Sequence, residues 1–589
     1  MIQLLKRMRR REALMALLCA VLVVGQVYFD LRLPDYMTEL TKLIKTPGSS
    51  TGDILSVGGE MLLCTLCSAV LAVGCGYLSA RTAAGFSFSV RRDLFHHVMD
   101  AGSEEMQTFS VPSLITRTTN DITQIQMIVA MGLQMLMKAP IMAVWAVIKI
   151  LGKSWTLSAV TAGFVVALVT LVLLIMSSCL PRFRRVQKKT DEINRVAREN
   201  LTGINVVHAF GAEDYQNKKF DGPSRDMMDL QLKNQRLFAL LQPAMGLGMN
   251  GLALAIYWVG AALVESIART DMAGRLTMFT NVLVFSTYAT YVVMSFMMLE
   301  MIFMLLPQAQ VSAERINEVL NTKPHVVEGL KTEGCETGTV EFRDVSFRYP
   351  HAAADELEHI SFRVERGQTL AIIGATGSGK TTLVSLAARF YDATEGQVLI
   401  DGQDVRSYSF DALYDRIGYV TQRAIVFAGD VRSNVLFGES SAPQDDESVQ
   451  RALSLAQATE FVDKLPGKLD APIAQAGANV SGGQKQRLSI ARALARKPEI
   501  LIFDDSFSAL DYRTDASLRA GLARELSDTT CLIVAQRIGT IRHADRIVVL
   551  DEGRVAGIGT HDELMKNCGV YREIAMSQLS AAELEKEGV

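Results

Sequence analysis

Six apolar segments, each long enough to cross a lipid bilayer, lie in the first 306 of the 589 residues. They span about 13–40, 54–80, 122–151, 155–180, 238–266 and 275–306. A spanning helix needs roughly 20 apolar residues, and hydrocarbon offers no water to bond the backbone, which favours helices. The sequence therefore predicts a membrane domain of six helices.

Basic residues set the predicted orientation of these spans. Basic runs lie at 6–11, 91–92 and 182–189, whereas the connections near 41–53, 152–154 and 267–274 are short and less uniformly basic. Because basic loops stay in the cytoplasm, both ends of the domain are predicted to be cytoplasmic. A secretory signal would also begin with basic residues, but no clear small-x-small cleavage site follows the first span. We therefore expect that span to be retained.

Helical patterns continue well beyond the bilayer over 80–100, 181–207 and 306–321. Short polar breaks around 103–120 and 209–216 separate paired extensions. If the helices are continuous, these breaks lie at cytoplasmic tips, placed to touch a second domain.

The pattern changes after Lys323 to short β-branched runs punctuated by glycine, which indicates an α/β domain. A single core rarely grows beyond about 250–300 residues, so two unlike domains fit this length. The predicted organisation is a transmembrane domain over 1–321, a linker over 322–337, an α/β domain over 338–578 and a charged tail over 579–589.

The segment from Gly374 to Thr381 reads GATGSGKT and matches the phosphate-binding P-loop pattern. It follows a predicted strand over 370–373 and precedes a helical pattern from Thr382. Glycines let backbone N–H groups curl around a phosphate, Lys380 reaches the β- and γ-phosphates, and the Thr381 hydroxyl can bind Mg²⁺. The predicted phosphate-binding residues are Gly374, Thr376, Gly377, Ser378, Gly379, Lys380, Thr381 and Thr382.

An apolar run over 500–503 precedes Asp504 and Asp505. A buried parallel strand delivers the side chains at its carboxyl end to the phosphate site, so Asp504 is expected to hold Mg²⁺ through water. This pattern occurs at many strand ends and gains its meaning from the P-loop. The pair of motifs indicates a nucleotide hydrolase, so the α/β domain over 338–578 is predicted to be a nucleotide-binding domain.

The segment from Val480 to Arg487 reads VSGGQKQR and resembles the signature of ABC transporters. Its serine can donate a hydroxyl, its glycines permit close approach of the backbone to phosphate, and the helix that begins there directs its N-terminal dipole at an anion. Val480 stands where the family usually has leucine. The resemblance implies that four residues cap the γ-phosphate of ATP bound by an opposite subunit: Ser481, Gly482, Gly483 and Gln484.

Further elements extend the resemblance over nearly the whole chain and point to the exporter-type (type IV) fold. Tyr349 resembles the aromatic residue that stacks on adenine, and Gln422 resembles the glutamine that faces Mg²⁺ and the membrane domain. Alone, either residue would fit a packing or solvated role, and order and spacing carry the assignment. The remaining similar segments are the D-loop at 508–511, the X-loop at 473–479, the second intracellular loop with its coupling helix at 199–213, and the helix at 312–320.

Two catalytic positions depart from the family. Asp505 stands where the family has a glutamate base, and Gln536 replaces the switch histidine. Aspartate is shorter by about 1.5 Å, and a misplacement of about 1 Å costs on the order of 10²-fold in rate. Glutamine does not titrate near neutral pH. We expect ATP binding to persist while hydrolysis at this site is weak, with catalytic positions Asp505, Gln536 and Gln422 and metal positions Thr381, Gln422 and Asp504.

This pattern resembles the degenerate-site subunit of bacterial heterodimeric multidrug ABC exporters, whose partner supplies the intact site. The resemblance implies a second half-transporter, ATP and Mg²⁺, a lipid bilayer and a small amphipathic drug, lipid or peptide as cargo. The alternative to a heterodimer is a homodimer in which Asp505 and Gln536 are both tolerated.

The expected location is a bacterial plasma membrane, with multiple spans and a cytoplasmic ATPase domain. A net charge of −3 gives no reason to expect a nucleic-acid partner. Two other functions remain open from the sequence: an exporter-fold importer of siderophore-like ligands, and a membrane ATP sensor that does not pump.

Lys138, Lys149 and Glu300 lie in or near the predicted spans, where ionisable side chains are costly and often functional. The lysines also fit an anchoring role, because a long side chain can extend its charge to the membrane interface. The sequence does not decide between these roles.

Overall fold

The computed structural model describes residues 1–45, 50–151, 153–350 and 352–578. The predicted tail at 579–589 lies outside the described residues. The chain forms two compact units, one of Met1–Val98 with Pro112–Asn321, the other of Met99–Val111 with the chain from Thr322 onward. We call them the membrane unit and the ATPase unit.

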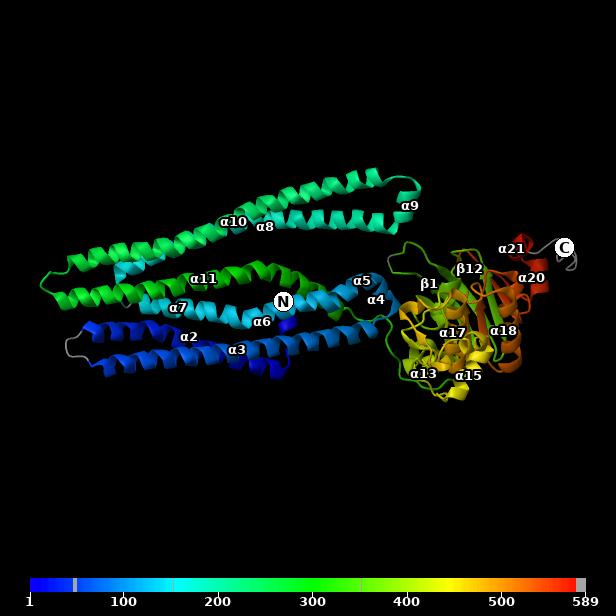
Figure 1. Cartoon of the computed structure of the whole chain (residues 1–589). Coiled ribbons are helices and arrows are strands. Elements are labelled where there is room, and N and C mark those ends of the chain that lie inside the picture. Colours follow the sequence, from blue (N-terminus) through cyan, green and yellow to red (C-terminus); the bar gives the residue numbers. More distant parts are fainter. Residues whose placement is uncertain (46–49, 152, 351, 579–589) are drawn as a thin grey trace. The chain divides into compact units, whose positions relative to one another are not determined.

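Long helices build the membrane unit, and six stretches are long and apolar enough to span a bilayer. This confirms the prediction of six spanning helices. Figure 1 shows these helices as long rods, with α8 and α10 joined at one end by α9. The principal helices are α2 (Arg10–Lys45), α3 (Thr51–Met99), α6 (Ile122–Met131), α7 (Met137–Leu151), α8 (Trp155–Thr202), α9 (Ile204–Ala209), α10 (Glu213–Ser266) and α11 (Met272–Asn321).

The two predicted polar breaks are shorter than the sequence suggested. Helix α4 (Ser103–Thr108) occupies the first, and the chain is helical again from α5 (Val111–Thr116). Helix α10 begins at Glu213 because acidic residues stabilise the first turn of a helix. Only 210–212 then separates it from α9, and the one exposed side chain in this connection is apolar, that of Phe210 at 81% exposure.

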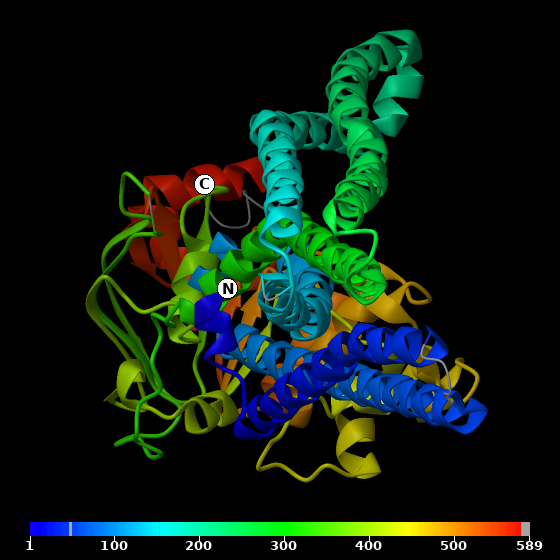
Figure 2. The same cartoon turned by 90° about the vertical axis from the view of Figure 1, so that its left-hand side faces the viewer.

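The third span contains two π-helical turns, η1 (Arg117–Asp121) and η2 (Gly132–Leu136), that the hydropathy pattern did not predict. In both views the hairpin of α8, α9 and α10 diverges from the other helices of the membrane unit toward its α9 end (Figures 1 and 2).

Both lysines singled out from the sequence are paired with carboxylates of α2. Lys138 Nζ lies 3.0 Å from Asp30, and Lys149 Nζ lies 2.7 Å from Asp35. The hydroxyl of Tyr288 on α11 also lies 2.7 Å from Asp35. These contacts join α2, α7 and α11, and they give the lysines a structural role within the membrane unit.

The ATPase unit is built on a sheet of six strands in the order β12-β11-β3-β10-β9-β6, in which β12 is antiparallel to its neighbour and the other pairings are parallel. These strands are β3 (Thr369–Gly374), β6 (Ile417–Val420), β9 (Ile500–Asp504), β10 (Thr530–Val534), β11 (Arg546–Asp551) and β12 (Arg554–Gly559). β9 and β10 are buried along their whole length, as apolar runs in parallel sheets usually are. The α/β domain predicted from the sequence is therefore confirmed.

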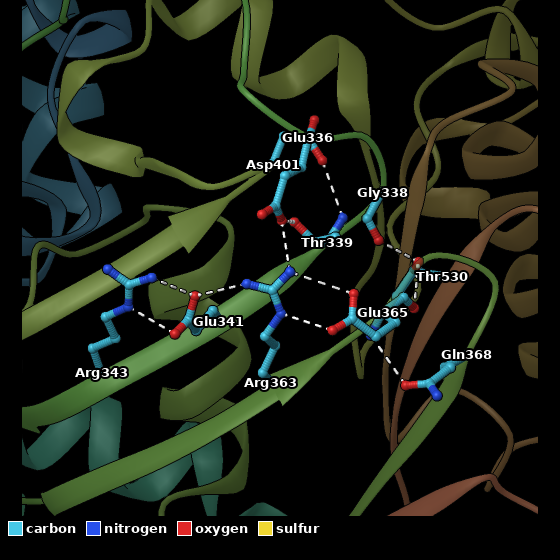
Figure 3. Close-up of polar contacts among 10 residues, drawn as sticks. All are labelled: Glu336, Gly338, Thr339, Glu341, Arg343, Arg363, Glu365, Gln368, Asp401 and Thr530. Carbon is cyan, nitrogen blue, oxygen red and sulfur yellow. Dashed lines mark hydrogen bonds and ion pairs between the residues drawn. The ribbon is translucent and has the colours of Figure 1, made fainter.

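A second, antiparallel sheet has the order β2-β1-β4-β5, with β1 (Val340–Phe347), β2 (Leu357–Val364), β4 (Glu395–Ile400) and β5 (Gln403–Asp404). Figure 3 shows that Arg363 on β2 reaches Glu336, Glu341 and Glu365. These ion pairs are partly exposed, so each adds little stability, but together they fasten residue 336 to the edge of β1 and β2.

The ion pair between Asp35 and Lys149 gives a test of the membrane unit. We expect Asp35→Asn to lower the free energy of unfolding by about 1–3 kcal/mol, because it leaves the half-buried Lys149 without its partner. The melting temperature of the chain in nanodiscs should fall accordingly. Asp35→Asn with Lys149→Met should recover part of that loss. Glu39→Gln, at an exposed position of α2, is the control. Equal melting temperatures for Asp35→Asn and the wild type would contradict a stabilising role.

Candidate functional site

The P-loop joins the end of β3 to helix α12 (Lys380–Ala387) at one edge of the six-stranded sheet. The helix begins at Lys380, two residues before the predicted Thr382, because Gly379 adopts a left-handed conformation with φ of 89° at its N-cap. Lys380 Nζ donates to the carbonyl oxygens of Gly374 and Ala375, at 3.0 and 2.7 Å. The ammonium group is therefore held within the loop.

Two glycines of this loop stand where a side chain does not fit. A Cβ on Gly374 would lie 2.2 Å from the Leu550 carbonyl oxygen, and one on Gly379 would lie 2.6 Å from Leu357. Gly377 has φ of 83° but no atom within 4 Å of an added Cβ. The loop is thus a close backbone turn that opens at Gly377, and such a turn can direct N–H groups at an anion.

Asp504 ends β9 beside the first turn of α12. The Thr381 hydroxyl donates to Asp504 Oδ1 at 2.9 Å, and the Tyr419 hydroxyl lies 3.4 Å from Oδ2. Burial raises the pKa of the Asp504 carboxyl, and the two hydroxyls partly oppose that shift. A hydroxyl next to a carboxylate is a donor set that Mg²⁺ accepts together with phosphate oxygens. The arrangement fits the predicted metal position.

Asp505 lies beside Asp504 and is held by two side-chain amides. Gln536 Nε2 donates to Asp505 Oδ2 at 2.8 Å, and Gln422 Nε2 donates to the same oxygen at 3.3 Å. Asp505 is 8% exposed, and burial raises the pKa of its carboxyl while both amides act in the opposite direction. Its φ of 46° places the backbone in the left-handed region. The three positions predicted to be catalytic therefore meet at one carboxylate oxygen.

Tyr349 contacts Thr382, which follows the P-loop. Its hydroxyl is 2.9 Å from Thr382 Oγ1, and its ring contacts Tyr391 edge to face at 5.4 Å. Tyr391 in turn accepts a hydrogen bond of 2.8 Å from Gln107 of α4. Sequence reasoning missed Tyr419, Tyr391 and Gln107, because none belongs to a motif that names its partner.

Ser481 caps helix α17 (Gly482–Ala495), and the cap is reciprocal. Its hydroxyl accepts from the Gln484 N–H at 3.3 Å, and Gln484 Oε1 accepts from the Ser481 N–H at 2.8 Å. An added Cβ on Gly482 would meet nothing within 4 Å, and one on Gly483 would meet only the Ala509 carbonyl oxygen. This helix start is exposed, and among the described residues no hydrogen bond joins it to the P-loop.

Both halves of the chain match known protein families. The family model described as the ABC transporter transmembrane region matches residues 16–303, and the one described as ABC transporter matches residues 357–508. An uncharacterized ABC transporter ATP-binding protein of Mycobacterium tuberculosis H37Rv is 38% identical over 93% of this chain and 94% of its own length. The ATP-dependent lipid A-core flippase of Aromatoleum aromaticum is 32% identical over 87% of this chain and 83% of its own length.

A solved structure described as a bacterial Atm1-family ABC exporter with ATP bound matches this chain with a TM-score of 0.79. It covers 97% of this chain and 99% of that chain at 24% identity, a likeness that shows the fold. The fold class predicted from the sequence is confirmed by this likeness and by the six spanning helices.

The two left-handed glycines of the P-loop give a matched pair of substitutions. Gly377→Ala should lower the free energy of unfolding by about 1–2 kcal/mol, because a residue with a side chain is strained in the left-handed backbone conformation of this position. Gly379→Ala should cost more, because its Cβ also meets Leu357 and the Glu356 carbonyl oxygen. Melting temperatures of the full chain without nucleotide test this order. Equal effects, or a larger effect of Gly377→Ala, would contradict the geometry.

Proposed function

Because the chain belongs to the ABC transporter family, we propose that it is the degenerate-site half of a heterodimeric exporter. It is a multi-pass membrane protein with a cytoplasmic ATPase domain, as the sequence predicted. An ABC ATPase domain implies ATP binding, and Mg²⁺ is typical of such domains. The asymmetry between this chain and its partner is the proposal.

The observation that carries the proposal is the hydrogen bond from Gln536 to Asp505. A general base must reach the attacking water, and the aspartate carboxylate stops about 1.5 Å short of a glutamate. Two amide donors also occupy one of its oxygens. The Gln536 amide supports this geometry without carrying the positive charge that a protonated histidine can offer. Slow hydrolysis at this P-loop is the expected consequence.

The groups proposed to bind ATP do not depend on Asp505. Tyr349 would stack on adenine and Lys380 would reach the terminal phosphates. Thr381 and Asp504 would hold Mg²⁺, which supplies charge neutralisation between the β- and γ-phosphates. Removing a catalytic group while keeping these contacts separates binding from turnover. The site is thus suited to retain ATP and close the dimer for many turnovers of the other site.

Two surfaces support a partner subunit. At the exposed start of α17, Ser481 and the N-terminal helix dipole can bind an anion. In the proposal this anion is a phosphate of the ATP bound by the partner. The α9 tip exposes Val206 and Phe210, at 60% and 81% exposure, in a position where apolar side chains favour burial. In the proposed heterodimer, Ser481 completes the hydrolysing site of the partner, and the α9 tip docks on the partner's ATPase domain.

A homodimer would contain two copies of the Asp505 and Gln536 site and no glutamate base. The heterodimer avoids this difficulty because the partner supplies an intact site. The cargo proposed is an amphipathic drug, lipid or peptide, and one relative named as a lipid A-core flippase fits that class. Closure of the ATPase dimer would move the membrane helices between inward-facing and outward-facing states.

Mg-ATP hydrolysis in lipid nanodiscs tests the proposal. We expect the purified chain alone to hydrolyse weakly, and full activity to require a second half-transporter whose own site carries the catalytic glutamate and the switch histidine. Changing the partner's catalytic glutamate to glutamine should abolish that activity, whereas Asp505→Asn in this chain should lower it less than twofold.

Asp505→Glu combined with Gln536→His is the matched control, because it restores the residues of an intact site within the same fold. We expect this double variant alone to hydrolyse at least tenfold faster than the wild-type chain alone. Robust hydrolysis by the wild-type chain alone, abolished by Asp505→Asn, would show that Asp505 is a working base and would overturn the proposal.

A further inference from the structure

A partly open cavity of about 200 Å³ lies in the membrane unit between α8, α10 and α11. Its wall is almost wholly apolar, with Leu168 and Val172 from α8, Met245 from α10 and Phe296 from α11. Among the described residues, Glu300 on α11 is the one ionisable residue of the lining. α10 packs against both α8 and α11, and the three helices can be followed in Figures 1 and 2.

The carboxylate of Glu300 differs from the other membrane-unit acids described above. Asp30 and Asp35 are each paired with a lysine, at 3.0 and 2.7 Å. Glu300 is half-buried, and among the residues that the structure describes it has no hydrogen bond or ion pair. A charge that faces hydrocarbon is expensive, so an acid kept there without a partner marks a functional position.

The size of the cavity limits what can enter it. An apolar cavity of about 150 Å³ can bind benzene, so this one has room for about one substituted aromatic ring. Phe296 and Met245 offer the polarisable surfaces on which aromatic groups pack well. A larger molecule would place one apolar arm inside and keep its remaining groups at the mouth.

We propose that this cavity binds a hydrophobic organic cation, with an aromatic arm among the apolar side chains and the positive charge beside Glu300. Low dielectric strengthens the attraction between opposite charges, whereas a neutral lipid leaves the carboxylate unpaired and an anion is repelled by it. The inference rests on the proposed function of the chain as a transporter. It narrows the amphipathic cargo to cations.

Binding of radiolabelled tetraphenylphosphonium to the full chain in nanodiscs, without nucleotide, tests this site. Tetraphenylborate is the matched ligand, because it has nearly the same size and shape and the opposite charge. We expect saturable binding of the cation and no saturable binding of the anion. Glu300→Gln should weaken cation binding at least tenfold, and Glu265→Gln, at an exposed position near the end of α10, should leave it unchanged.

Val169→Phe, which fills the cavity from α8, provides a second variant that keeps Glu300. It should also weaken cation binding at least tenfold, while both variants bind a fluorescent ATP analogue as the wild type does. Equal affinity of the wild type and Glu300→Gln would overturn the inference, as would equal binding of both ions or no saturable binding of the cation. None of these results bears on ATP-site asymmetry, which the hydrolysis assays decide separately.

Discussion

Parallel pairing of β9 with β10, and of β10 with β3, is the constraint on which the ATPase site depends. Asp504 pairs with Val534, and Val534 pairs with Ile372 near the end of β3. This register ends three strands at the same edge, so the P-loop, both aspartates and Gln536 arrive together although up to 162 positions separate them in the chain, from Gly374 to Gln536. A shift in the register of one strand would move these side chains apart. The buried apolar runs of β9 and β10, which set that register, therefore also determine where the site residues lie.

The charged side chains of Lys138, Lys149 and Glu300 lie in two kinds of environment within the membrane unit. Lys138 and Lys149 are neutralised by carboxylates of α2, which fastens α2 to α7. Glu300 instead faces an apolar cavity on α11. The same cost of a charge in hydrocarbon explains both arrangements, because a paired charge stabilises packing and an unpaired one favours a ligand of opposite sign. The proposed cargo and the stability of the membrane unit thus both follow from the free-energy cost of placing a charge in hydrocarbon.

Sequence reasoning predicted what local patterns determine. The spans follow from hydropathy, and the P-loop strand and helix follow from glycine spacing, with an error of two residues at Lys380. It did not predict contacts set by tertiary packing. The pairing of Lys138 with Asp30 joins residues 108 positions apart, and the Gln107 contact with Tyr391 joins residues 284 apart. The π-helical turns of the third span also left no mark on hydropathy, because π and α turns use the same apolar residues.

The most direct test of the asymmetric site is the state of the nucleotide on this chain during turnover. The complex with its partner is allowed to hydrolyse Mg-8-azido-ATP labelled at either the α- or the γ-phosphate, is photocrosslinked, and its subunits are separated. The proposal predicts that this chain retains γ-label and α-label in a ratio near one, because ATP at its P-loop is not hydrolysed. A ratio near zero on this chain, with α-label still attached, would contradict it.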